Sequence, residues 1–146
     1  MARPKDIGTA AETAVVKALR RLGWPHAERR ALTGALDQGD ITGTPGVVWE
    51  VKGGKQTRSP SDEQIAAWMQ ETETERIHAR ANVGVLVLQR HGVGPDNAHR
   101  WWAYLQADDW IAGAGHDIPM RFLLNDACVL LRWGGYGEPL PEAVSG

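Results

Sequence analysis

The stretch GDITGTPGVVWEVK, residues 39–52, decides how this chain folds. Its second half, residues 47–52, is rich in β-branched and aromatic side chains, which is typical of a short strand. Successive strand side chains point to opposite faces, so Val47, Trp49 and Val51 share an apolar face. Glu50 and Lys52 then lie side by side on the other face. We therefore expect a strand with one face in the core and one face that carries opposite charges.

A tight turn precedes this strand. Thr44-Pro45-Gly46 has the residues of a turn, because proline presets φ and glycine tolerates positive φ. We expect residues 39–42 to fold back antiparallel to residues 47–52 as a hairpin. In that arrangement Asp40 approaches Glu50.

Asp40, Glu50 and Lys52 together suit the hydrolysis of a phosphodiester. Carboxylate oxygens hold Mg²⁺, which polarises a phosphate and acidifies a bound water. An ammonium group can position that water or offset developing negative charge. The pair Glu50 and Lys52 alone is equally typical of a cross-strand ion pair on a half-exposed strand, so the rest of the chain has to decide between the two interpretations.

The first helix is predicted over Gly8–Leu22, where apolar residues recur at helical spacing and Gly23 and Pro25 end the pattern. Glu12 falls near the buried side of this helix. Two roles remain open for it. It can close a capping box with Thr9, three residues earlier, or it can bind a metal or a water.

Positive charge gathers near the hairpin. Residues 1–60 hold ten Lys and Arg and six acids, whereas residues 61–146 hold six and twelve, for a total of -2. Arg29 and Arg30 lie on opposite faces of a predicted strand over 27–33, and Lys55 and Arg58 lie in the loop 53–60. These side chains can meet phosphate, although a charge on an edge strand also discourages aggregation.

The remaining elements alternate along the chain. A second helix begins at Ser61 with capping-box spacing to Gln64, and Glu71, Glu73 and Glu75 fit a solvated face of it. Residues 82–89 form a continuous apolar run, which predicts the centre of the sheet. Further strands are expected over 100–105 and 120–124, with 128–133 as another strand or a turn. The tryptophans fit core packing, a self-association surface or a platform on which bases stack.

Length and composition predict one domain over residues 1–146, with a core over about 8–133 and a flexible tail over 134–146. The single Cys128 is expected to be a small buried hydrophobe, and no Cys and His spacing fits zinc. No phosphate loop of the NTPase kind is present. The absence of an apolar segment of membrane-spanning length, of an apolar N-terminal leader and of paired cysteines predicts a cytoplasmic protein.

Taken in this order, the elements and charged residues resemble the PD-(D/E)XK nuclease superfamily, and within it the archaeal-type and phage-encoded Holliday junction resolvases. The resemblance covers Gly8–Leu105 and implies an α/β fold with a restriction-endonuclease-like αβββαβ core, a central mixed sheet flanked by helices. Gly39 stands where the family name has proline. The family site matches, in chain order, Glu12, Asp40, Glu50, Lys52 and Gln64.

The resemblance also implies a mechanism. Asp40, Glu50, the Val51 carbonyl and Glu12 would hold Mg²⁺ or Mn²⁺, Lys52 would place the attacking water, and Gln64 would orient Lys52 or that water. The residues expected to contact DNA phosphates are Arg29, Arg30, Lys55 and Arg58.

A homodimer acting on four-way DNA junctions is the implied enzyme, because two opposed strands must be cut. Two alternatives stay open. One is another nuclease on the same core, such as a nickase, a restriction-type enzyme or an exonuclease. The other is a DNA-binding subunit without catalysis.

Overall fold

The protein is an α/β protein with a mixed four-stranded sheet packed against helices, as seen in a computed structural model that describes residues 4–30, 39–114 and 118–141. The strands are β3 (Val47–Lys52), β4 (Val83–Leu88), β5 (Trp102–Gln106) and β6 (Pro119–Leu123), in that spatial order. β3 and β4 run parallel, and the other two pairs are antiparallel. β4 is buried along its whole length, which confirms its predicted place inside the sheet.

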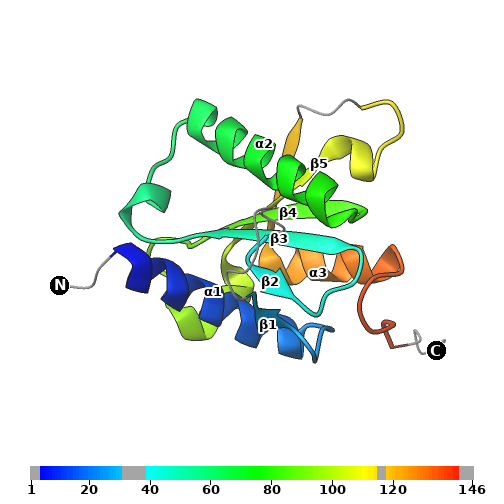
Figure 1. The fold of residues 1–146 in the computed structure, drawn as a ribbon, viewed down its shortest axis with the longest axis horizontal. Coiled ribbons are helices and arrows are strands. Elements are labelled where there is room, and N and C mark those ends of the chain that lie inside the picture. Colours follow the sequence, from blue (N-terminus) through cyan, green and yellow to red (C-terminus); the bar gives the residue numbers. More distant parts are fainter. Residues whose placement is uncertain (1–3, 31–38, 115–117, 142–146) are drawn as a thin grey trace, which may run out of the picture.

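Helices cover both faces of this sheet. α1 (Pro4–Arg21) and α3 (Leu124–Trp133) pack on one face, and α2 (Asp62–Ala79) packs on the other (Figure 1). Within the described ranges, no helix is both long enough and apolar enough to cross a membrane.

The α1 and α3 face holds the larger core. The predicted apolar stripe of α1 is buried there through Ala11, Val15 and Leu19. It packs against the apolar face of β3, where Trp49 is fully buried and its ring meets Trp24 edge-on, with centroids 5.6 Å apart. The predicted alternation along residues 47–52 is confirmed on this side. α1 begins at Pro4 rather than Gly8.

The hairpin expected over 39–52 was partly wrong. The turn is present, since the Val47 N–H donates to the Thr44 carbonyl at 3.0 Å. However, β2 (Ile41–Thr42) pairs with β1 (Glu28–Arg29) in a separate two-stranded sheet. One edge of β2 is occupied by β1, and a single backbone bond, from the Asp40 N–H to the Trp49 carbonyl at 2.9 Å, joins its start to β3. The later part of the strand predicted over 27–33 lies outside the described residues.

The C-terminal region also differs from expectation. Residues 128–133 belong to helix α3 and not to a strand. Leu124, Ala127, Cys128 and Leu131 are its buried side chains, and that spacing is helical. Cys128 is buried, as expected, and burial raises the pKa of its thiol.

The segment after α3, which we expected to be a flexible tail, is bonded to the core as far as the structure describes it. The Glu138 N–H donates to the Gly23 carbonyl at 2.8 Å, and Arg132 donates to the carbonyls of Glu138 and Pro139. The first bond ties the segment to the turn that follows α1, and the other two tie it to α3.

Candidate active site

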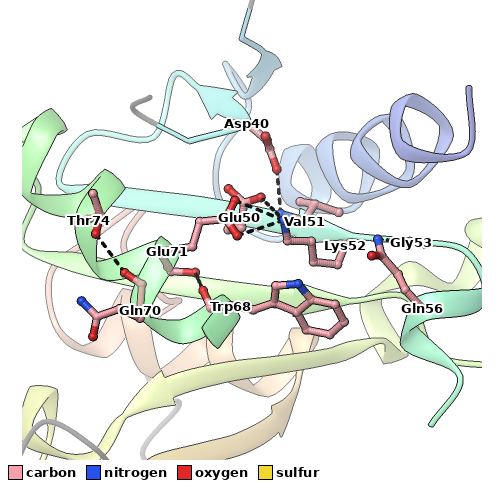
Figure 2. A network of polar contacts seen from close by, with 11 residues as sticks. Asp40, Glu50, Val51, Lys52, Gly53, Gln56, Trp68, Gln70, Glu71 and Thr74 are labelled. Atoms are coloured by element: carbon pink, nitrogen blue, oxygen red, sulfur yellow. Dashed lines mark hydrogen bonds and ion pairs between the residues drawn. The ribbon is translucent and has the colours of Figure 1, made fainter. Parts of the chain in front are cut away.

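Asp40 lies beside the open edge of β3. Its backbone N–H donates to Trp49, and its carboxylate accepts a hydrogen bond from the Val51 N–H at 2.8 Å. Figure 2 shows this carboxylate directed at the end of β3, where Glu50 and Lys52 also project. The prediction that Asp40 approaches the acid and lysine of this strand is therefore confirmed, although the contact is made by side chain and loop and not by a hairpin ladder.

The backbone conformation at residue 39 excludes proline and favours glycine. Gly39 has φ +95°, and proline is restricted to about -65°. A Cβ at this position would also come within 2.9 Å of the Val48 side chain. Glycine thus lets the chain turn tightly against β3 and places Asp40 on its edge.

The charged face of β3 lies under α2. The Lys52 ammonium is 3.1 Å from a Glu50 carboxylate oxygen and 3.2 Å from a Glu71 oxygen. Glu71 comes from the middle of α2, so this ion pair joins the helix to the strand (Figure 2). Glu50 is only 5% exposed, which makes this a buried ion pair and not the half-exposed face of an ordinary strand.

Glu75 was misassigned from the sequence. We expected it on a solvated face of α2, but it is 1% exposed and lies close enough to Glu50 to lower the pKa of that acid by hydrogen bonding. The spacing held a signal for this, because Glu75 lies seven residues after the buried Trp68 and so falls on the same side of the helix.

Burial and negative neighbours shift the acids of this site. Burial, followed by the charge of Glu50, raises the pKa of Asp40 to about 8, against the opposing hydrogen bond from Val51. Burial also raises the pKa of Glu50, against the hydrogen bond from Glu75 and the charge of Lys52. The site holds more negative charge than Lys52 can balance, which is a condition that favours binding of a cation or a proton.

Lys52 is held in its charged form. Burial alone would lower the pKa of its ammonium, but the charges and hydrogen bonds of Glu50 and Glu71 outweigh burial and raise that pKa. Lys52 can therefore donate hydrogen bonds and stabilise negative charge at neutral pH, and it is unsuited to act as a general base.

Two groups of oxygen atoms could hold a divalent cation. Glu50, Glu71 and Glu75 place carboxylate oxygens within 4.8 Å of one another, and they are the one acidic triplet of this kind in the described part of the chain. The alternative group consists of the carboxylates of Asp40 and Glu50 and the backbone carbonyl of Val51. That carbonyl points to the open edge of β3, because a strand residue directs its N–H and C=O to the same side and the Val51 N–H meets Asp40 there.

The second group fits better, because the first already surrounds a cation. Lys52 lies within 3.2 Å of both Glu50 and Glu71, so a metal ion among those carboxylates would compete with its ammonium. The second group shares Glu50, but its other carboxylate, Asp40, takes part in none of the ion pairs of the described residues.

Glu12 is engaged elsewhere. Its carboxylate accepts a hydrogen bond from the Arg29 guanidinium at 3.0 Å. Because α1 begins at Pro4, Thr9 lies inside the helix and the proposed capping box was wrong. Thr9 instead accepts a second hydrogen bond from Arg29, at 3.4 Å. Glu12 is near enough to raise the pKa of Asp40, yet its direct partner is Arg29.

Gln64 is not brought to Lys52. Its side chain is exposed, and its backbone N–H donates to the Ser61 side chain, which caps α2 as predicted. Glu71 lies seven residues further along the same stripe of the helix, about 10 Å away along its axis, and it occupies the place beside Lys52 that we assigned to Gln64.

The arginine and lysine candidates are dispersed. Arg30 is partly buried and its backbone N–H donates to the Asp40 carbonyl at 2.8 Å. Lys55 and Arg58 are exposed on the short 3₁₀ turn Lys55–Thr57 and the residue after it. This turn follows directly from the charged end of β3.

A family, a curated relative and a solved structure were each sought for this chain, and none matched.

Proposed function

We propose that this protein is a metal-dependent DNA endonuclease with a restriction-endonuclease-like core. One observation carries the proposal, namely that Asp40, Glu50 and Lys52 meet at the end of one edge strand in a partly buried, acid-rich site. Neighbouring acids and a charged lysine are the groups that phosphodiester hydrolysis by metal ions requires. A purely structural ion pair would not need Asp40, whose burial opposes its ionisation.

Asp40, Glu50 and the Val51 carbonyl would hold Mg²⁺ or Mn²⁺ at the open edge of β3. All three are oxygen donors, which these hard cations prefer. When bound, the ion would polarise the scissile phosphate and acidify a water. Glu12 would add negative charge nearby, and its bond to Arg29 keeps it in place.

Lys52 would position the attacking water or stabilise the charge that develops on the phosphate. Glu71 and Glu75 would act through their neighbours. Glu71 holds the Lys52 ammonium from the α2 side, and Glu75 lies beside Glu50 and lowers the pKa of that acid. Both are positioning residues that the sequence pattern did not reveal.

The substrate we propose is a four-way DNA junction, cleaved by a homodimer because two opposed strands have to be cut. Arg29, Arg30, Lys55 and Arg58 would contact phosphates, of which Lys55 and Arg58 are the exposed pair adjoining the site. Another nuclease on the same core, such as a nickase or an exonuclease, is the second candidate. It would use the same chemistry and act on DNA of a different shape.

The test is cleavage of a labelled four-way junction beside linear duplex and single strand, in Mg²⁺, Mn²⁺ or EDTA. Paired, metal-dependent cuts confined to the junction are expected. Cleavage of all three DNAs would retain the nuclease and discard the junction. No cleavage with either metal would favour the other alternative, in which the protein is a non-catalytic subunit that binds DNA.

Two variants connect the activity to the site. We expect Asp40→Asn and Lys52→Ala each to reduce cleavage about a thousandfold or more while the protein stays folded. Asp96→Asn, which removes an exposed acid far along the chain, serves as the matched control and should cleave like the wild type. Full activity in either site variant would refute the site assignment.

A further inference from the structure

A groove lies on the α2 side of the sheet, beyond the part that the helix covers. Its volume is about 460 Å³, and it runs between the loop before α2 and strands β5 and β6. Trp102 and Tyr104 line it from the sheet, and Ile65 lines it from α2. The α2 helix packs on β3 and β4, so this half of the sheet keeps its aromatic side chains beside an open groove.

The groove and the active site share two rows of the sheet. Lys52 pairs in register with Leu88, which in turn pairs with Trp102. Side chains in such a row point to the same face and are spaced by roughly 4.8 Å per strand, so Trp102 lies about 10 Å from Lys52.

The neighbouring row leads from Glu50 on β3 to Arg121 on β6 through Leu86 and Tyr104. The groove therefore lies on the same face of the sheet as Glu50 and Lys52. It also adjoins the loop that begins after Lys52.

The rim of the groove is basic. Arg58 and Arg121 are exposed lining residues, and Asp62 is the one acid among the residues that line it. The guanidinium carbon of Arg121 lies 4.0 Å from the centre of the Trp102 ring, and that of Arg90 lies 4.2 Å from it.

None of these three arginines takes part in the ion pairs found within the described ranges. Arg90 donates one N–H to the Arg100 carbonyl at 3.3 Å, and a planar guanidinium group on an aromatic ring can still direct its other N–H groups to an anion. Such a surface is complementary to a ligand in which anionic groups alternate with planar aromatic rings.

We infer that this groove binds an unpaired segment of the DNA strand that the active site cleaves. Arg58 and Arg121 contact consecutive backbone phosphates, and a base stacks on the guanidinium planes that lie over Trp102. A duplex hides the faces of its bases, whereas an unpaired strand exposes them to aromatic and guanidinium planes. The inference rests on the proposed nuclease function and names the form of DNA that reaches the site.

The test is the fluorescence anisotropy of labelled oligothymidylate and of a duplex of equal length, measured in EDTA so that no cleavage occurs. In single-strand binding, each phosphate contact contributes about 0.7 to the slope of log affinity against log salt. Arg58→Gln with Arg121→Gln should therefore reduce that slope by about 1.4, and weaken single-strand binding about 25-fold at about 0.1 M salt. Duplex binding should change much less.

The matched control is Arg21→Gln, which removes an exposed arginine at the end of α1. It should leave single-strand binding within about twofold of the wild type, because it lies on the helix that packs against the opposite face of the sheet. Single-strand affinity unchanged in the double variant would overturn the inference. So would an equal loss for duplex and single strand, or competition by polyglutamate as strong as that by oligothymidylate.

The two proposals can fail separately. A protein that cleaves no DNA yet loses single-strand binding in the double variant would refute the nuclease and keep the groove. A metal-dependent nuclease whose single-strand binding ignores Arg58 and Arg121 would keep the proposed function and refute the groove.

Discussion

The two faces of β3 are buried to a similar degree but in opposite ways. Trp49 faces α1 and is fully buried among apolar neighbours, whereas Glu50, the next residue, faces α2 and is 5% exposed among other charges. Burying an aromatic side chain stabilises the fold, while burying carboxylates costs free energy that ion pairs seldom recover in full. The apolar face therefore stabilises the structure, and the charged face is where we propose that the chemistry takes place.

The contrast extends across the sheet. The α1 and α3 face is closed by a continuous core. The α2 face has a smaller apolar cluster around Trp68 and Leu86, with the acid and lysine site on one side and the basic groove on the other. Both sites that we propose thus lie on the face that one helix only partly covers.

The largest effect on stability should come from the apolar face. Trp49→Ala removes a fully buried ring that contacts Trp24, and we expect a loss of about 3–5 kcal/mol in the free energy of unfolding. Urea denaturation measures this loss. Trp133→Ala is the matched control, since Trp133 is 78% exposed, and it should change stability by less than about 0.5 kcal/mol. Equal losses in the two variants would contradict the assigned core.

The charged face should make stability depend on pH. The folded-state pKa of Asp40, about 8, lies above its ordinary value of 3.8, so protonation favours the folded state. This contribution is fully present below pH 4 and is lost as the pH rises through about 8. Urea denaturation in EDTA should show the protein less stable at about pH 9 than at about pH 5, on the order of a few kcal/mol.

Asp40→Asn controls for the other groups that titrate over this range. The variant should flatten the dependence of stability on pH, because the amide keeps the shape of the acid and does not ionise. If the stability of the variant depended on pH as steeply as that of the wild type, the pH dependence would arise from residues other than Asp40.

A smaller effect separates the two possible cation positions. We expect Asp40→Asn to weaken Mg²⁺ binding at least about tenfold, as measured by calorimetry with the DNA absent. Glu75→Gln should change that affinity less than about threefold, because Glu75 contacts Glu50 from the α2 side. If the loss in Glu75→Gln were the greater, the cation would lie under α2, among Glu50, Glu71 and Glu75.

The smallest effect is expected at Gln64. Its side chain is exposed at the start of α2, whereas Glu71 contacts Lys52 directly. Gln64→Ala should leave the cleavage rate within about threefold of the wild type, and Glu71→Gln should reduce it more. Single-turnover cleavage at saturating DNA would compare them. A greater loss in the Gln64 variant would support the role implied by the resemblance, in which Gln64 orients Lys52 or the attacking water.

Local patterns predicted much of the fold and the convergence of Asp40 with the charged face of β3. The stripe of α1, the buried strand over 83–88 and the alternation along 47–52 are visible as periodicities, and the alternation put Glu50 and Lys52 on one face of β3. The pattern failed at Glu75, because a glutamate in an acidic run is usually solvated. It failed again at residues 128–133, where an apolar run fits a strand and a helix equally well.

The sequence by itself determined the turn at Thr44 to Gly46, the two unlike faces of β3 and the Gly39 conformation that brings Asp40 to its edge, because these depend on neighbouring residues and backbone sterics. The tertiary structure alone decided that Glu71 and Glu75 lie over β3, that Gln64 does not, and that Trp102 meets Arg90 and Arg121. Those contacts depend on where α2 rests and how it is rotated on the sheet. Side chains distant in sequence set both, by packing to exclude empty volume.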